Sequence, residues 1–167
     1  MPIEINSEAG LSITTEGAGN RQRFAEVFGQ VWQSIPAEER EEIVAHWEEG
    51  FAGQVSPQIE LLAEYELPGK NDAFGNILYF NAEVAELLDD ADLLPDLIAH
   101  ELGHVYCFSI SAPGHASFPP IVLAKEDEAD AKANDWGYDM HTLRNWTNEH
   151  IEEMADCGVF IPEGGRW

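Results

Sequence analysis

The chain has 167 residues, of which 32 are Asp or Glu and only 8 are Lys or Arg, so its formal net charge is −24 at pH 7. Bases this few and scattered cannot neutralise a phosphate backbone, which excludes nucleic-acid binding, and the same charge disfavours an anionic membrane surface. Five Trp and eight Phe exclude a disordered acidic tail, and no apolar run is long enough to cross a bilayer.

The length predicts a single domain over residues 1–167, large enough to bury a hydrophobic core. The first residues lack the basic and apolar regions of a secretory signal, and Cys107 and Cys157 are too few for a disulfide scaffold. We therefore expect two free thiols and a cytoplasmic protein. The sequence carries no indication of oligomeric state.

An amino-terminal helical pair is predicted over 21–49. In its first helix, 21–34, the apolar residues follow the i, i+3, i+4, i+7 spacing of one helix face: Phe24, Val27, Phe28, Val31 and Trp32. The second helix runs through 38–49, with Pro36 just inside its start and with Ile43, Val44 and Trp47 facing inward. Strands are predicted over 58–67 and 77–80, separated by a turn over 68–72 that contains Pro and Gly. Asn81 is placed to cap a following helical turn.

Residues 92–109 predict a buried central helix, because their apolar side chains occupy nearly every direction around the axis. The Pro-rich stretch 111–120 predicts a loop, and 123–136 and 139–156 predict two further helices, the last capped by Asp139. The predicted fold class is α+β in the order α-α-β-β-α-α-α. A small mixed or antiparallel sheet would pack beside the central helix, with further helices on both sides.

The predicted central helix contains His100-Glu101-Leu102-Gly103-His104. Imidazoles at i and i+4 project to the same side of a helix, which suits two ligands of a catalytic zinc. Glu101, about 100° further round the axis, could act as a general base on a water molecule without being a ligand itself. Two His and a Glu without partners would each cost several kcal/mol in so apolar a helix, which favours a metal site over a chance pattern.

A third ligand is predicted on the 123–136 helix. Glu126 and Asp130 share its inward face with two alanines, Ala129 and Ala133, whereas Glu128, Lys132 and Asp135 lie on the solvent side. We expect Glu126 to bind zinc and Asp130 to accept a hydrogen bond from a ligand imidazole, most simply that of His100. The small alanines would let this helix approach Gly103 closely, although an ordinary core contact is the alternative reading.

HELGH at 100–104, followed by EDEAD at 126–130, resembles the gluzincin clan of zinc metallopeptidases. It is most similar to minimal-scaffold gluzincins, including the ImmA/IrrE-type peptidases, and the resemblance covers 77 to about 137. The resemblance implies a zincin-like fold with His100, His104 and Glu126 as zinc ligands. It also implies Glu101 as the base and Asp130 as a residue that contacts a ligand rather than the zinc itself. It further implies that an extended peptide binds along an edge strand formed by Ile77, Leu78, Tyr79 and Phe80. An ordinary core strand is the alternative reading of these residues.

The expected function is zinc-dependent hydrolysis of peptide bonds in a protein or peptide substrate, as an endopeptidase. Zinc would lower the pKa of its water toward about 7, and Glu101 would take the proton and pass it to the leaving amine. The oxyanion would need a further stabiliser, for which the candidates are Tyr138, His141, Arg144 and His115. The negative charge favours basic residues near the scissile bond, and a role in solubility alone is the alternative reading.

Two other functions remain open from the sequence: a zinc-binding regulatory or interaction module without turnover, and a metal-free structural domain. Glu101 favours the enzyme, because a module that only binds has no need of a base at that place. Cys107 is expected to be a free thiol rather than a ligand, and His46 and His150 are expected on the solvent-exposed sides of acidic helices.

Overall fold

The structure, a computed structural model, describes residues 3–6, 12–50, 58–63, 65, 67–71, 77–107 and 119–161. Among these residues one mixed sheet has the strand order β1-β2-β3-β5-β4. Its strands are β1 (Ile3–Asn6), β2 (Ser12–Gly17), β3 (Gln58–Leu62), β4 (Gly69–Asn71) and β5 (Ile77–Asn81). The helices are α1 (Arg21–Ser34), α2 (Ala37–Gly50), α3 (Ala82–Asp90), α4 (Leu94–Tyr106), α5 (Pro119–Asp135), α6 (Met140–Glu149) and α7 (Ile151–Asp156).

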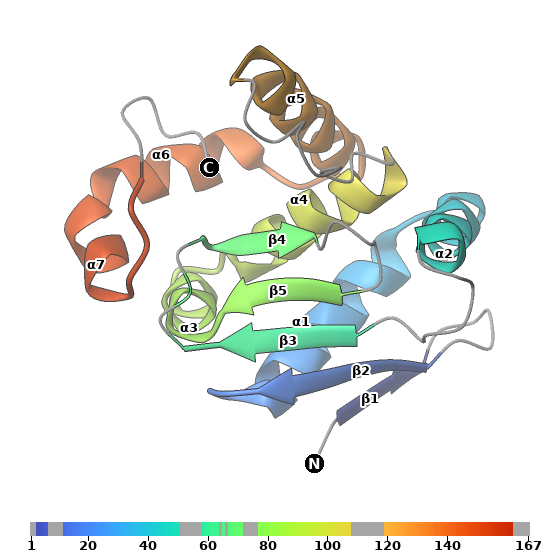
Figure 1. The fold of residues 1–167 in the computed structure, drawn as a ribbon, viewed down its shortest axis with the longest axis horizontal. Coiled ribbons are helices and arrows are strands. Elements are labelled where there is room, and N and C mark those ends of the chain that lie inside the picture. Colours follow the sequence, from blue (N-terminus) through green and yellow to red (C-terminus); the bar gives the residue numbers. More distant parts are fainter. Residues whose placement is uncertain are drawn as a thin grey trace.

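The described chain thus combines helices with a small sheet, as predicted. β2, β3 and β5 are parallel, while β1 and β4 pair antiparallel at the two edges, so the sheet is mixed rather than wholly antiparallel. Helices α1 and α4 lie behind the sheet in Figure 1, and α4 contacts α1, α2, α3, α5 and α6. Helix α4 is therefore the central helix that the sequence predicts.

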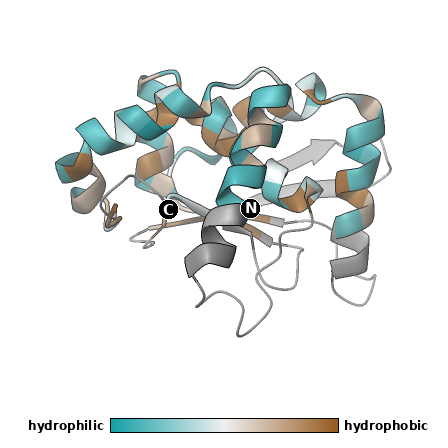
Figure 2. Cartoon of the chain, turned by 90° about the horizontal axis from the view of Figure 1, so that it is seen from above, coloured by the Kyte–Doolittle hydropathy of each residue, from teal (hydrophilic) through white to brown (hydrophobic). Residues whose placement is uncertain are grey.

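The inner faces of the helices and buried side chains of β3 and β5 form the core. All five apolar residues predicted for the inward face of α1 are buried, as are Ile43 and Val44 of α2, while the side chain of Trp47 lies outside the described part of the chain. Hydrophobic and hydrophilic residues alternate in bands along the described helices in Figure 2, as expected for helices that each bury one side. None of the helices in the described ranges has both the length and the apolar character of a membrane span.

The sheet differs from the prediction in three places. Strands β1 and β2 precede the first predicted element, and β3 ends at Leu62 rather than at residue 67. The predicted turn over 68–72 is wrong for 69–71, because these residues pair with β5 as strand β4. Gly69 and Asn71 have the composition of a turn, but pairing with a strand distant in sequence overrides that local preference.

Helix boundaries also differ from the prediction. Asn81 caps α3 through a hydrogen bond from the backbone N–H of Val84, but α3 extends over 82–90 rather than one turn. Helix α4 begins at Leu94 and α5 already at Pro119, while 111–118 of the predicted loop lie outside the described residues. The predicted helix 139–156 is two helices, because the backbone leaves helical geometry at His150. Asp139 caps α6 as predicted.

Candidate metal centre

Three side chains from two helices converge on one point in the core. His100 and His104 project from the same side of α4, and Glu126 reaches them from α5. These three residues are the metal group. The Nε2 atoms of the two histidines lie 3.1 Å apart. Oε2 of Glu126 lies 2.9 Å from Nε2 of His100 and 3.3 Å from Nε2 of His104. Atoms bound tetrahedrally to zinc at about 2.0–2.1 Å are about 3.3 Å apart, so this donor set fits a zinc ion.

The two helices can bring these side chains together because Gly103 lacks a side chain. A Cβ atom on Gly103 would lie only 2.8 Å from the carbonyl oxygen of Ala129. Ala129 and Ala133 are fully buried on the facing side of α5. The close approach predicted from these small residues is therefore confirmed, and it sets the distance from α4 at which Glu126 is held.

A chain of hydrogen bonds extends behind His100. Its Nδ1 lies 2.7 Å from Oδ1 of Asp130, which is the pairing predicted from the sequence. Arg144 of α6 in turn donates to both carboxylate oxygens of Asp130, from Nη2 at 2.8 Å and from Nε at 3.1 Å. Asp130 and Arg144 are mostly buried, so this two-point contact fixes the carboxylate that orients the His100 ring.

Glu101 lies beside the group without belonging to it. Its side chain is 2% exposed, and Oε1 lies 3.9 Å from Nε2 of His100. Its other oxygen, Oε2, is buried and accepts no hydrogen bond from the residues that the structure describes. A buried carboxylate oxygen without a partner is costly and is rarely kept without a role.

Burial and neighbouring charges shift the pKa values of the group. Burial opposes protonation of His100, but its hydrogen bonds to Asp130 and Glu126 outweigh burial and raise its pKa to about 9. Burial favours the neutral form of Glu126, yet His100 and His104 hold the pKa of this carboxyl well below its usual range. Burial raises the pKa of Glu101. A proton on His100 therefore balances the carboxylates of the metal-free protein.

This proton would make the binding of a metal ion at His100 pH-dependent. The pKa of His100 is higher in the folded protein than the value of about 6.5 in an unfolded chain, so its stabilising effect is complete below pH 6.5 and lost as pH rises through 9. A zinc ion on Nε2 of His100 would have to displace this proton, so we expect zinc affinity to rise about tenfold per pH unit between pH 7 and 9. Competition titrations with a chelating dye at several pH values would measure this, and a flat profile would contradict it.

The other predicted residues are distributed differently. Of the four oxyanion candidates, Arg144 is beside the metal group, with Nη2 3.6 Å from Oε2 of Glu126. Tyr138 instead forms a hydrogen bond with Ser34 of α1, and His141 is exposed and pairs with Asn145. His115 lies outside the described residues.

The edge position predicted for Ile77–Phe80 is wrong, because this segment, β5, lies between β3 and β4. Strand β4 forms the edge next to α4. Leu78 and Phe80 are buried core residues, which matches the alternative reading of an ordinary core strand.

Three further expectations are corrected or confirmed away from the metal group. Lys132 is not on an open solvent face, because Oε2 of Glu39 in α2 accepts hydrogen bonds from its Nζ and from Nε1 of Trp136, each at 2.7 Å. His46 and His150 are half-buried rather than solvent-exposed, with Nδ1 of His46 donating to the carbonyl of Val105. Both cysteines are free thiols, as predicted.

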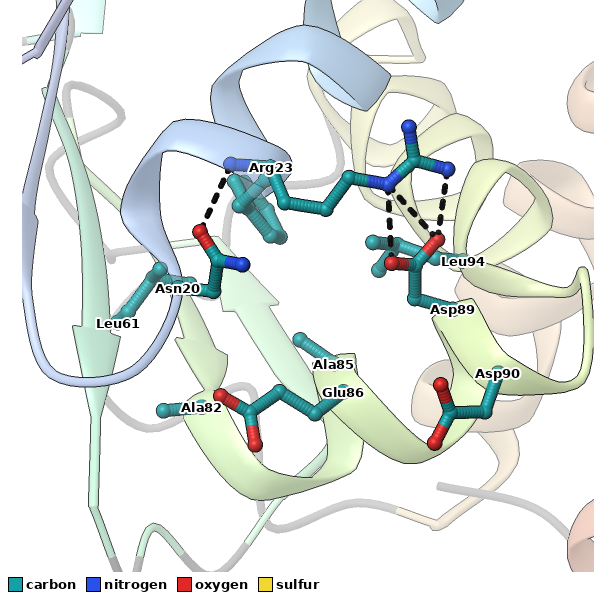
Figure 3. Close-up of a pocket in the computed structure, with 10 residues that line it drawn as sticks. Asn20, Arg23, Leu61, Ala82, Ala85, Glu86, Asp89, Asp90 and Leu94 are labelled. Atoms are coloured by element: carbon teal, nitrogen blue, oxygen red, sulfur yellow. Dashed lines mark hydrogen bonds and ion pairs between the residues drawn. The ribbon is translucent and has the colours of Figure 1, made fainter.

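Two of the pockets among the described residues are lined by charged side chains. One of about 450 Å³ lies between α5 and α6 and reaches Asp130 and Arg144, so it adjoins the chain of hydrogen bonds behind His100. The other, of about 250 Å³, lies between α1 and α3 and contains no residue of the metal group. Figure 3 shows the Arg23–Asp89 pair along one side of this second pocket and the carboxylates of Glu86 and Asp90 along another.

No protein-family model matches the chain, and no match was found among curated proteins or among solved structures. The geometry of the group formed by His100, His104 and Glu126 is therefore the main basis for a functional assignment.

Proposed function

We propose that this protein is a zinc-dependent peptidase of the gluzincin type, with a zincin-like fold. The observation that carries the proposal is the convergence of three ligand atoms at tetrahedral spacing beside a buried carboxylate that is not one of them. Three protein ligands leave a fourth position of zinc open, which distinguishes catalytic from structural zinc sites. The intact carboxylate of Glu101 supports turnover over binding alone.

Each residue has a distinct part in hydrolysis. A zinc ion held by His100, His104 and Glu126 would polarise the scissile carbonyl and acidify a water molecule. Glu101 would accept the proton of that water and deliver it to the leaving amine. Burial raises the pKa of this carboxyl, which makes its anion a stronger base. Asp130 keeps the His100 ring in the tautomer that presents Nε2, and Arg144 holds Asp130 in place.

The position of the sheet edge favours a peptide as the substrate. Because β4 is the edge strand beside α4, an extended segment of substrate would pair with β4, rather than with β5, through main-chain hydrogen bonds. The charge of −24 favours substrates with basic residues near the cleaved bond. Because an extended segment within a chain can pair with β4, we propose internal cleavage of a polypeptide.

Metal content and cleavage should be measured on the same preparation. We expect one zinc per chain by elemental analysis, with anomalous scattering placing it between His100, His104 and Glu126. A labelled, unstructured polypeptide rich in Lys and Arg should be cleaved, with cleavage abolished by a chelator and restored by zinc. Folded protein that binds no metal would overturn the proposal, and stoichiometric zinc without cleavage of this polypeptide or of a peptide library would favour the regulatory module.

A further inference from the structure

Gly69 opens the edge strand β4 at a buried position opposite Phe80 of β5. Its φ is not among the positive values found at other glycines of the described chain, so its backbone conformation is open to any residue. Glycine is less stable than alanine within a strand, and where it occurs there it often marks a close approach of another group. The reason for glycine at this position must therefore be sought in the space around it.

That space is filled by Glu101. A Cβ atom on Gly69 would lie 2.9 Å from Oε1, 3.0 Å from Cγ and 3.1 Å from Cδ of Glu101. The three nearest atoms all belong to this one side chain, and none belongs to the backbone. Since Glu101 is 2% exposed, its carboxylate cannot swing out into solvent to make room. A methyl group at position 69 would have to turn the carboxylate relative to His100 and His104.

We propose that Gly69 is a positioning residue for Glu101. The absence of a side chain lets the carboxylate rest against the backbone of β4, with Oε1 3.9 Å from Nε2 of His100. The inference rests on the proposed function, because the position of Glu101 matters only if this carboxylate handles a proton at the metal centre. It also assigns β4 a role in setting the base, in addition to the peptide pairing proposed for its open side.

A double-mutant cycle tests the contact without any need for turnover. Gly69→Ala should lower the Tm of the metal-free protein by about 5 °C or more, as expected for overpacking. In a Glu101→Ala background, which removes all three crowded atoms, the same change should leave Tm unchanged or raise it slightly. A folded double variant alongside an unfolded Gly69→Ala single variant would support the same contact. Equal losses of Tm in both backgrounds would overturn the proposal.

Two further readouts separate positioning from a general loss of packing. In the zinc-loaded protein, Gly69→Ala should reduce kcat about tenfold or more while KM and zinc affinity change less than about twofold. In the cobalt-substituted protein, Gly69→Ala should shift the pH midpoint of the change in visible absorption in the same direction as Glu101→Gln shifts it. An unchanged kcat, or zinc affinity that falls as far as kcat, would overturn the proposal. If the wild type cleaves nothing, the proposed function fails, and the double-mutant cycle still decides whether Gly69 makes room for the side chain of Glu101.

Discussion

Replacing Glu101 by Gln should leave zinc bound and reduce kcat by about 10²–10⁴-fold, the range expected for loss of a general acid–base group. The amide has nearly the shape of the carboxylate but cannot accept the proton of the attacking water. Because Oε2 of Glu101 is buried without a partner among the described residues, removing the charge should not destabilise the metal-free protein. Steady-state kinetics, elemental analysis and thermal unfolding of one preparation measure all three effects.

Glu128→Gln is the matched control for this variant, since it makes the same chemical change at an exposed position of α5. Its kcat, KM and zinc content should equal those of the wild type. Turnover of Glu101→Gln within a few-fold of the wild type would show that another group takes the proton. A loss of zinc from Glu101→Gln would mean instead that this carboxylate is a ligand.

Replacing His100 by Ala should lower zinc affinity by more than about 100-fold, because the loss of a direct ligand costs more than the loss of the groups that orient one. Zinc raises the Tm of any protein that binds it only in the folded state, so the wild type should unfold at a higher temperature with excess zinc. The His100→Ala variant should show a much smaller rise at the same zinc concentration. Unfolding curves with and without zinc would test this.

His141→Ala provides the control for that experiment, because His141 is an exposed imidazole on α6 whose partner is Asn145. Its zinc-dependent rise in Tm should equal that of the wild type. A His100→Ala variant that still responds fully to zinc would place the metal elsewhere in the chain. The ligand set proposed here would then be wrong.

The residues of the metal group could be predicted because the spacing of residues within one helix determines which side each of them faces. The spacing of His100 and His104 fixes their common side of α4, and the position of Glu126 and Asp130 relative to Ala129 and Ala133 identifies the inward face of α5. Local hydrogen bonding likewise made the cap at Asn81 predictable. These features depend on neighbours within about one or two helical turns.

The features that were missed depend on partners distant in sequence. Strand β4 is stabilised by its pairing with β5, and nothing in the residues 69–71 alone distinguishes this strand from a turn. A sequence does not reveal the lateral order of strands either, which is why the edge position predicted for β5 is wrong. The helical pattern places Lys132 on the solvent side because its partner, Glu39, belongs to another helix.

The pairing of basic side chains within the fold affects how ions meet this protein. Arg23, Lys132 and Arg144 each contact a carboxylate of another helix, so part of the small positive charge is neutralised internally. The remaining carboxylates produce a field that concentrates cations near the surface over roughly one Debye length, about 8 Å at physiological ionic strength. Divalent metal ions would thus be captured faster in dilute buffer than in concentrated salt, even though the ligands themselves are buried.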